Sequence, residues 1–539
     1  MPMPRFFAGQ RPFILAVAVA AITALFLHFW RIGSAPSGFY GDECSIAYNA
    51  YCIAETGADE YGTPYPVFFR GFDNYHDPAM VYALVPLIKV FGLEVWAARF
   101  PSAFFHILAS VAFAFLVQGY CRNRWLSLAG GVLFSVVPWT FPVSRTISAG
   151  YTAMLFGMAA GWFWLLRAFG REWHGYAAAA GVAWAFAMYA HNIGRPMTAL
   201  LLVGFIACFN CTLLSRWRVG LTFATTYLAA LLPMIICVLR TPQALTTRFQ
   251  TMSIFQGHPS LSALLERFGS RFVDYFSPRF LLMSGDSNLR HHTGFAGELF
   301  WFTIPLIVAG LYCVVRFFRT QPYYRFLMIS LLVYPAAAAL TVNRMHSMRC
   351  VNGVIAWLLL AMVGARWLWQ QRRVGRTLLA ALCVVGLIEA GAYLADYFGP
   401  YQTRCRVAFG TAFTEAVKYC FNRIGTNQTL YVSGSVSAPC SFLVDLDLKP
   451  YLYAYLLFYG RIDPWSYQHG GLSHTIVQPY FDHIDQPGLF LRCNCMPLLR
   501  EGTQVLAVAN IEPVPTQAKL LATFQDQAPF EYQVFEIKR

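Results

Sequence analysis

Charged residues are scarce in this chain. Asp, Glu, Lys and Arg together make up 12% of its 539 residues, whereas hydrophobic residues make up 57% and the mean hydropathy is +0.47. Soluble globular proteins carry roughly 25% charged residues, so this composition excludes a soluble protein and predicts one whose main solvent is lipid. The formal net charge of +14 comes mostly from Arg between apolar runs, and we interpret it as a sign of membrane topology rather than of nucleic-acid binding.

Internal repeats and low-complexity tracts are also lacking. Membrane carriers commonly show two related halves with broken helices at matching positions, so the lack of a repeat argues against a transporter. Several of the 14 Cys lie inside apolar runs as ordinary small hydrophobes, and they indicate no metal centre. Five of the 14 lie in the C-terminal tail: Cys405, Cys420, Cys440, Cys493 and Cys495. An oxidising exterior would allow at least one disulfide among them, although the sequence does not indicate which cysteines pair.

Eleven apolar runs are of membrane-spanning length. The hydrocarbon core is about 30 Å thick, which about 20 residues of apolar helix can cross. The runs fall at about residues 12–30, 98–118, 125–142, 151–168, 173–190, 196–214, 219–239, 298–316, 325–342, 350–370 and 377–395. The pattern predicts a polytopic α-helical membrane protein. The first run could instead be a secretory signal peptide, since GSAPSG follows it, but its length favours a retained helix.

Arginine is concentrated in alternate loops between these runs. By the positive-inside rule the Arg-rich loops face the cytoplasm, which places residues 31–97, residues 240–297 and the tail from about 398 outside. Segment 79–97 is apolar enough to count as a twelfth span, which would invert everything downstream. Its Lys89, Glu94 and the following Arg99 favour an interfacial helix instead.

The tail changes character after Gly399 and Pro400. Charged residues return, the runs TLYVSGSV and QVLAVANI are typical of strands, and RVAFGTAFTEAVKYCF is typical of a helix. The chain is therefore predicted to have two domains. Residues 1–397 form a transmembrane bundle with external loops at 31–97 and 240–297, and residues 398–539 form a periplasmic or extracellular α/β domain.

The first external loop carries two adjacent acids, Asp42 and Glu43, about a dozen residues beyond the first span. A carboxylate in such a loop could act as a general base. The alternative for Asp42 is a helix N-cap, because ECSIAYNAYCIA after it looks helical and Asp is a preferred capping residue. A second acidic pair, Asp59 and Glu60, is followed by the turn-like sequence Tyr-Gly-Thr-Pro, so we rank it below Asp42.

A series of short motifs carries a family resemblance. The order GDE, DEYG, PYPVFFRGF, IKVFG and AARFPSAF resembles the GT-C superfamily of membrane glycosyltransferases, in particular bacterial members related to protein O-mannosyltransferases and to the lipid A aminoarabinose transferase. The resemblance implies transfer of a sugar from a polyprenyl-phosphate donor. It makes the acid of the DE motif the catalytic base, and the match falls on Asp42 with Glu43 beside it. It also matches IKVFG to a lysine-bearing interfacial helix, so Lys89 is a candidate phosphate contact.

Other basic residues are candidates for binding the donor phosphate. Arg195 in YAHNIGRPM lies at an external helix end, where a charge normally faces a cavity and a partner or else snorkels to the interface. His346 and Arg349 in TVNRMHSMRC resemble the family's His-and-Arg stretch at this point. Arg70 in PYPVFFRGF and His76, just before the interfacial helix, are expected to reach the same cavity.

The second large loop contains the polar stretch FSPRFLLMSGDSNLRHHTG. Its Arg290 is a candidate for binding a pyranose or a phosphate. The adjacent His291 and His292 are a poor metal pair without a third ligand, for which Asp286 is only a guess. We therefore predict no resident metal or other cofactor, and a divalent metal stays the less favoured alternative.

These patterns together predict a multi-pass glycosyltransferase of the inner (plasma) membrane with its active site facing the periplasm or exterior. Inversion at the sugar carbon follows from the resemblance. The expected partners are a polyprenyl-phosphate-linked sugar donor, a lipid, glycan or protein acceptor, and the bilayer, but no nucleic acid. Two alternatives stay open: a transporter or flippase of lipid-linked sugars, and an oligosaccharide ligase with a diphosphate donor, for which the WWDYG-like signature is missing.

Overall fold

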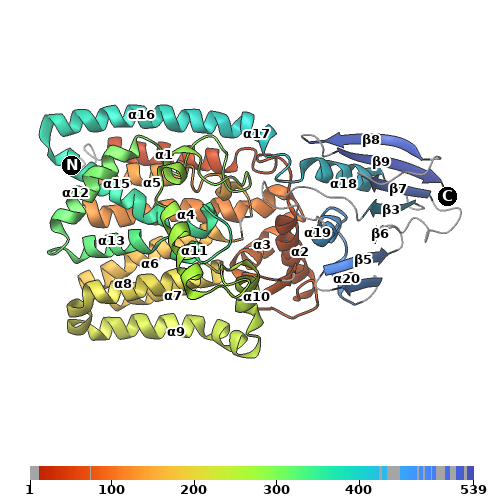
Figure 1. Ribbon diagram of the computed structural model, residues 1–539, viewed down its shortest axis with the longest axis horizontal. Helices are drawn as coiled ribbons and strands as arrows, with labels where there is room; N and C mark the ends of the chain where they lie inside the picture. The colour runs from red at the N-terminus through yellow and green to blue at the C-terminus, as the bar shows by residue number, and fades with distance from the viewer. Residues whose placement is uncertain are drawn as a thin grey trace, which may run out of the picture.

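The structure of the protein is a computed structural model. It describes residues 11–72, 74–147, 149–423, 428–433, 449–469, 473–477, 480–486, 489–492, 504–509, 518–526 and 531–538. A bundle of roughly parallel helices occupies one side and a β-sheet domain the other, with α16 and α9 along opposite edges of the bundle (Figure 1). All eleven predicted apolar runs coincide with bundle helices: α1 (Arg11–Phe29), α4 (Val95–Cys121), α5 (Arg124–Val136), α6 (Tyr151–Arg171), α7 (His174–Ala190), α8 (Gly194–Ser215), α9 (Trp217–Arg240), α12 (Thr303–Phe317), α13 (Pro322–Val333), α15 (Gly353–Gln370) and α16 (Arg372–Phe398).

Seven of these helices are long and apolar enough to cross a membrane: α1, α4, α6, α8, α9, α15 and α16. The runs predicted at 125–142 and 325–342 are shorter as helices than expected, because α5 ends at Val136 and α13 ends at Val333. Pro138 and Pro335 follow these ends, and proline removes a helical hydrogen bond and disfavours helix in the residue before it. The chain is a multi-pass membrane protein, with spans that differ in length.

The helix bundle exposes large apolar side chains on its outer surface, unlike a protein that folds in water. The outer helices expose large apolar side chains, as in α9, where Leu239 is 77% exposed, and α16, where Leu387 is 75% exposed. The central helices α6 and α15 are mostly buried among the other helices. Large apolar side chains on the outside are favourable against lipid but not against water. Helices suit the bilayer because they satisfy their own backbone polar groups.

The first loop forms the base of the bundle on the side of the sheet domain. It contains α2 (Gly41–Thr56), the hairpin of β1 (Phe69–Gly71) and β2 (Asn74–His76), and α3 (Pro78–Phe91). The predicted interfacial segment is α3, whose 14 residues reach only about 21 Å at 1.5 Å per residue and so fall short of the hydrocarbon core. Gly92, with φ of +74°, ends α3 and allows the chain to turn into α4.

The second loop contains α10 (Gln243–Met252), α11 (Leu261–Asp274) and the short helix η3 (Arg279–Met283). Further short elements connect the bundle helices: η2 (Pro142–Arg145), α14 (Ala336–Ala339) and η4 (Ser347–Cys350). The strand-free stretch after η3, from Ser284 to Phe302, crosses to the first loop and carries several of the polar residues singled out in the sequence.

The C-terminal domain is a mixed α/β unit, as predicted. The seven strands that the structure describes pair in the order β4-β5-β6-β3-β7-β9-β8, and among them only the β3–β6 and β3–β7 pairs are parallel. The strands are β3 (Gln428–Ser433), β4 (Ser473–Val477), β5 (Tyr480–Gln486), β6 (Leu489–Arg492), β7 (Gln504–Ala509), β8 (Lys519–Gln525) and β9 (Glu531–Lys538). The helices are α17 (Pro400–Arg404), α18 (Thr411–Arg423), α19 (Lys449–Tyr459) and α20 (Pro464–Gln468). The predicted strands TLYVSGSV and QVLAVANI supply β3 and β7, and the predicted helix supplies α18.

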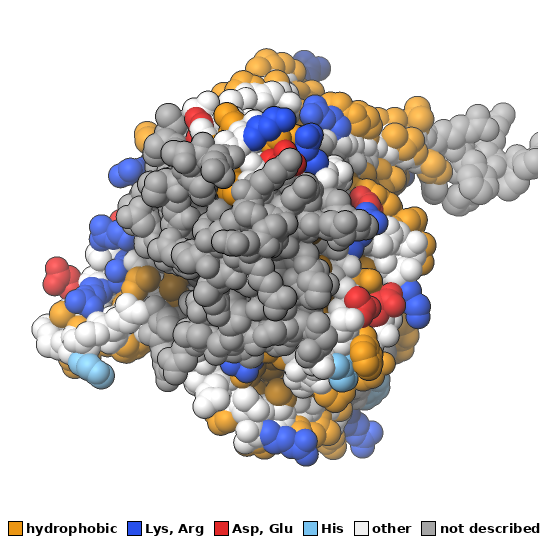
Figure 2. Space-filling model, turned by 90° about the vertical axis from the view of Figure 1, so that its right-hand side faces the viewer, with side chains coloured by type: hydrophobic (Ala, Val, Ile, Leu, Met, Phe, Trp, Pro, Cys, Tyr) orange, Lys and Arg blue, Asp and Glu red, His pale blue; other side chains and the backbone are white. Residues whose placement is uncertain are grey.

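Charged side chains of both signs lie at several places around the rim of this end of the molecule (Figure 2). Such a surface is typical of a face in contact with water. Cys405 and Cys420 are buried free thiols, and the other three tail cysteines lie outside the described residues. A disulfide in the tail therefore stays a prediction for those three.

The C-terminal domain contacts the first loop through hydrogen bonds. The Tyr48 hydroxyl donates to the Ile462 carbonyl at 3.1 Å, and the Gln468 amide donates to the Asp59 carbonyl at 2.7 Å. Between these contacts the Tyr453 hydroxyl donates to Glu60 Oε1 at 3.3 Å. Burial raises the pKa of Glu60 from about 4.5 to about 8, so this carboxyl is protonated at neutral pH.

Glu60 should make this contact less stable as the pH rises. Below about pH 4.5 the carboxyl is protonated in the folded and unfolded states alike; between pH 4.5 and 8 the unfolded state loses its proton first, and stability falls. Glu60→Gln stays neutral and should melt at a higher temperature than the wild type at pH 8, with little difference at pH 4.5. Thermal unfolding in detergent measures this. Glu55→Gln, on the exposed side of α2, is the control, and an equal Glu60→Gln effect at both pH values would contradict the assignment.

Candidate functional site

The two predicted catalytic acids lie in the first turn of α2. The N-cap of this helix is Tyr40, in an extended conformation, and Asp42 and Glu43 follow at the second and third helical positions. The N-cap alternative for Asp42 is therefore wrong, because the chain enters the helix two residues earlier. Negative side chains in a first turn still interact favourably with the helix dipole.

Glu43 is fully buried and all of its hydrogen-bonding capacity is used. Its Oε1 accepts from Arg99 Nε and from the Ile147 N–H, each at 2.9 Å. Its Oε2 accepts from an Arg99 terminal nitrogen at 2.9 Å and from the Tyr40 N–H at 3.3 Å. A carboxylate held by four donors in the interior is poorly placed to take a proton from a substrate. These contacts favour a positioning role for Glu43, and the catalytic role that the sequence also allowed stays a prediction.

Arg99 extends this arrangement to the chain that leads into α2. The remaining N–H groups of its guanidinium donate to the carbonyls of Pro36 at 2.8 Å, Gly38 at 2.7 Å and Ile32 at 3.3 Å. Gly38 has φ of +83°, and a Cβ atom there would lie 2.6 Å from the Thr411 hydroxyl of α18. The ion pair thus fixes the direction in which α2 begins, and glycine allows α18 to pack closely against it.

Asp42 differs from Glu43 in its surroundings. It is half-buried, and it lies near enough to Tyr40 for its charge to raise the pKa of that phenol, after burial, which has the larger effect. The Arg290 guanidinium lies over the Tyr40 ring, 5.1 Å from its centre, and the Tyr40 hydroxyl donates to the Ile147 carbonyl at 3.3 Å. The structure thus places a partly accessible carboxylate and an arginine of the second loop around one tyrosine, a residue that the sequence interpretation missed.

The second loop is organised by Asp286, which is buried. Its carboxylate accepts from the backbone N–H groups of Asn288 at 2.8 Å and Ser347 at 2.9 Å. His291 Nδ1 lies 3.3 Å and His346 Nδ1 3.9 Å from Asp286 Oδ2, and the two imidazole rings are 4.7 Å apart. Burial alone would raise the pKa of Asp286, but the bond to His291 and the charge of His346 hold it well below its ordinary value. Burial lowers the pKa of His291 despite the neighbouring carboxylate.

Asp286, His291 and His346 could together hold a divalent metal ion, because one ligand atom of each lies within 4.8 Å of the others. Two imidazole nitrogens and a carboxylate oxygen suit zinc or a similar ion. The sequence indicates that the adjacent His291 and His292 are a poor metal pair, with Asp286 only a guess at a third ligand. The structure groups His291 with Asp286 and with His346 from a segment further along the chain, whereas His292 bonds to the backbone of Gly294 and Gly297.

Arg195 has the partner that its position predicted. At the start of α8 it forms an ion pair with Asp77, whose other oxygen accepts the Asn192 N–H at 2.9 Å. The Arg195 guanidinium also lies over the Phe68 ring, 4.9 Å from its centre. This pair ties α8 to the residue before α3, so most of the charge of Arg195 is already neutralised.

The other predicted basic residues are spread over the loops. Lys89 lies in the exposed last turn of α3 and makes no ion pair with the described residues. Arg70 is exposed on β1 and lies over the Tyr61 ring, while His76 is buried on β2. Arg349 is buried in η4, three residues from His346, where its charge acts on His291. Of the predicted basic residues, Arg290 is therefore the one that shares a neighbour, Tyr40, with Asp42.

Comparison with solved structures identifies the architecture. Crystal structures of ArnT from Cupriavidus metallidurans, bound to undecaprenyl phosphate and in the apo state, match with TM-scores of 0.53 and 0.55. Each match covers 98% of this chain and 98% of that chain, at 14% and 13% identity. This chain has an ArnT-like fold. The resemblance to the GT-C superfamily and its lipid A aminoarabinose transferase is thereby confirmed at the level of the fold.

A more distant match is the archaeal oligosaccharyltransferase AglB from Archaeoglobus fulgidus, in complex with an inhibitory peptide and a dolichol-phosphate. Its TM-score is 0.49 at 11% identity, and the match covers 79% of this chain and 63% of that chain. Comparisons with protein-family profiles and with curated proteins found no match. The ArnT-like fold is therefore a likeness of structure rather than of sequence.

Replacing Glu43 should destabilise the protein far more than replacing Asp42. Glu43→Gln leaves the Arg99 charge buried without its counter-ion, and breaking such a pair costs about 3–5 kcal/mol of folding free energy. Asp42→Asn should cost less than about 1 kcal/mol, through the helix dipole alone. Unfolding by denaturant in detergent measures both variants. Glu94→Gln, which breaks the exposed 2.6 Å pair with Arg461, is the control and should also cost less than about 1 kcal/mol. Equal losses for Glu43→Gln and Glu94→Gln would contradict this role.

Proposed function

We propose that the protein is a membrane glycosyltransferase that transfers a sugar from a polyprenyl-phosphate donor to a lipid, glycan or protein acceptor. The ArnT-like fold supports the reaction class, and the half-buried carboxylate of Asp42, which lies near Tyr40 as Arg290 does, supports the site. The solved relative is bound to undecaprenyl phosphate, which supports a donor of that chemical kind. The site would lie in the inner membrane at its periplasmic or external face, where residues 31–97, 240–297 and 398–539 meet.

Asp42 is the proposed general base. In the proposed step the acceptor oxygen or nitrogen attacks the anomeric carbon, the bond from that carbon to the phosphate oxygen breaks, and the acceptor proton passes to the Asp42 carboxylate. Displacement from the face opposite the phosphate would invert the anomeric configuration. Of the two acids of the DE motif, only Asp42 has a carboxylate that is not enclosed by donors, which is why it is preferred over Glu43.

Cations of the second loop are proposed to hold the departing phosphate. Arg290 lies nearest to the Asp42 side through its contact with Tyr40, and His346 and Arg349 follow on the adjoining segment. An arginine matches the geometry of a phosphate with two parallel hydrogen bonds, and positive charge stabilises the leaving group as its charge develops. Lys89 and Arg70 are less favoured because they are exposed, Arg195 because it is paired with Asp77, and His76 because it is buried on β2. A metal at Asp286, His291 and His346 would add positive charge to the same region.

Two other functions are less well supported. A transporter or flippase of lipid-linked sugars would not need a partly accessible carboxylate beside an arginine. A ligase with a diphosphate donor would also fit the fold class, so the donor has to be determined by experiment. Neither alternative is favoured by a specific contact in the described residues.

Asp42→Asn should abolish most of the turnover without preventing folding. Asparagine keeps the size and much of the hydrogen bonding of Asp42 but cannot accept the proton, and general-base catalysis is worth about 10²–10⁴-fold. Mass spectrometry of the envelope glycans from a deletion strain, complemented with wild type or variant, first identifies the product and then measures its loss.

A matched control is available in the C-terminal domain. Asp463 is a true N-cap, its carboxylate accepting from the Ser466 N–H at 2.8 Å, so Asn should replace it with little effect. Near-normal product from a well-folded Asp42→Asn protein would remove Asp42 from the chemistry. An unchanged envelope in the deletion strain under every growth condition tested would instead count against the glycosyltransferase itself.

The proposed topology places the N-terminus in the cytoplasm and the C-terminal domain outside. Alkaline phosphatase fused after Ala408 should therefore be active, because the enzyme folds only outside the cytoplasm. A fusion after Arg319, in the Arg-rich loop between α12 and α13, should be inactive. The reverse pair of activities, in membrane-inserted protein, would reject this orientation.

A further inference from the structure

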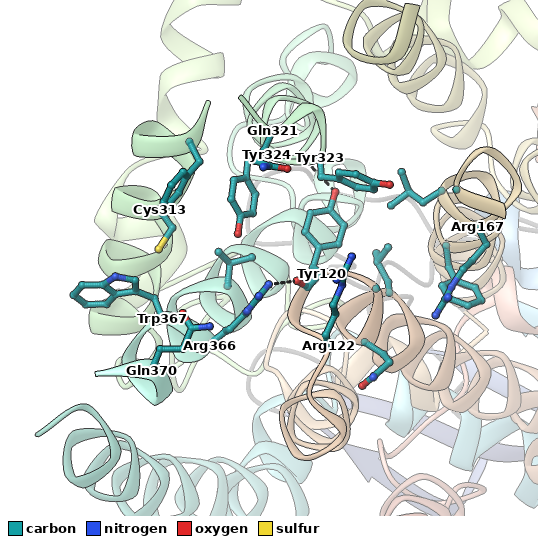
Figure 3. Close-up of a pocket in the computed structure, with 18 of the residues that line it drawn as sticks. Tyr120, Arg122, Arg167, Cys313, Gln321, Tyr323, Tyr324, Arg366, Trp367 and Gln370 are labelled. Atoms are coloured by element: carbon teal, nitrogen blue, oxygen red, sulfur yellow. Dashed lines mark hydrogen bonds between the residues drawn. The ribbon is translucent and has the colours of Figure 1, made fainter. Parts of the chain in front are cut away.

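A large cavity lies at the end of the bundle opposite the C-terminal domain. Its volume is about 800 Å³, and it is enclosed by the last turns of α4, α6, α12 and α15 and the first turn of α13. Figure 3 shows its polar side chains, with Arg122 and Arg366 on either side of Tyr120, Arg167 across the cavity, and Tyr323 and Tyr324 along another wall. A cavity of this size can hold a ligand head group. It lies far from Asp42 along the helices and plays no part in the proposed transfer.

The cavity is strongly positive. Four arginines line it, Arg122, Arg167, Arg171 and Arg366, and none of the lining residues is Asp or Glu. Arg366 donates to the Tyr120 carbonyl at 2.6 Å, while the other three form no ion pair with described residues. Like charges gathered in one cavity repel one another unless an anion neutralises them.

The other walls suit an amphiphile. Phe163, Leu166, Phe317 and Trp367 supply apolar and aromatic surface, and the Tyr120 hydroxyl donates to the Tyr323 carbonyl at 3.1 Å. Gln118 also lines the cavity, and its side-chain oxygen is buried without a hydrogen-bond partner among the described residues. A buried amide without a partner normally indicates a missing water or ligand.

Simpler explanations account for the arginines one at a time but not together. The positive-inside rule places arginine in such loops, and arginine at a helix C-terminus, such as Arg171 in α6, interacts favourably with the helix dipole. Neither explains why four of them surround one cavity with aromatic walls. Arg218, Arg319 and Arg373 are exposed, as Arg122 and Arg171 also are, but they do not line the cavity, so they provide a direct comparison.

We propose that this cavity binds the phosphate head group of an anionic membrane lipid. Arginine binds phosphate oxygens through paired hydrogen bonds. Basic pockets between membrane helices on the cytoplasmic side of the bilayer, where the proposed topology places this cavity, are suited to phospholipid head groups. The apolar and aromatic walls would cover the first part of the lipid chains. The phosphate could belong to a bilayer glycerophospholipid or to a polyprenyl phosphate, because both present the same group.

The test compares two triple variants of the full chain in detergent. Arg122→Gln with Arg167→Gln and Arg171→Gln removes three charges from the cavity, and Arg218→Gln with Arg319→Gln and Arg373→Gln removes three from exposed loops. Native mass spectrometry then measures the binding of phosphatidylglycerol, a polyprenyl monophosphate and, as a neutral reference, phosphatidylcholine. The cavity variant should lose about 100-fold in affinity for the anionic lipids, which corresponds to about 3 kcal/mol at 1.4 kcal/mol per tenfold. The loop variant should bind as the wild type does.

The outcomes separate the possible sources. Tighter binding of phosphatidylglycerol identifies the bilayer as the source, and tighter binding of the polyprenyl phosphate identifies a carrier lipid; either supports the site. Equal affinities of the two triple variants, or wild-type binding no stronger than that of phosphatidylcholine, would overturn it. If the triple cavity variant does not give monodisperse protein, two double variants replace the triple variants. The cavity double variant is then Arg122→Gln with Arg167→Gln, and the control double variant is Arg218→Gln with Arg319→Gln.

Discussion

A buried ion pair between Arg99 and Glu43 holds the extramembrane half of this protein in place. Arg99 belongs to the first turns of α4, and Glu43 to the first turn of α2, 56 residues earlier in the chain. Three backbone carbonyls between α1 and α2, together with the N–H groups of Tyr40 and Ile147, complete the hydrogen bonding of the two charges. Buried charges are tolerated only with such complete pairing. The pair therefore fixes the start of α2 against three separate parts of the bundle.

Because of this ion pair, the two neighbouring acids differ: Glu43 is buried and fully hydrogen-bonded, and Asp42 is partly accessible. With Glu43 turned inward, Asp42, one residue before it on the helix, lies on the side of Tyr40 and Arg290. Asp286 holds the second loop in place, as Arg99 holds the first, because its carboxylate accepts from the N–H groups of both Asn288 and Ser347. The two loops meet where Arg290 lies over Tyr40. Asp42 and Arg290 thus lie around the same tyrosine, and the proposed transfer from a phosphate leaving group would use this carboxylate and this cation.

The bundle could be predicted from the sequence because each span is a local property, a run of apolar residues of sufficient length. The shortened helices were predictable in principle from Pro138 and Pro335. The site was predictable only in part: the DE motif identifies the acids, but the choice between Asp42 and Glu43 depends on Arg99, which no local pattern connects to either. The grouping of His346 with His291 and Asp286 is likewise a long-range contact, so the sequence could indicate Asp286 only as a guess and did not connect His346 to this cluster.

In the proposed transfer the donor phosphate binds at Arg290, and the Asp42 carboxylate faces the sugar from the acceptor side. An electron cryo-microscopy structure of the full chain with a polyprenyl phosphate in a lipid nanodisc tests it most directly. The account predicts phosphate oxygens within hydrogen-bonding distance, about 3 Å, of the Arg290 guanidinium, with the Asp42 carboxylate facing the same space. A phosphate held at Lys89 and Arg70 instead, with Asp42 and Arg290 enclosed by protein, would contradict the claim.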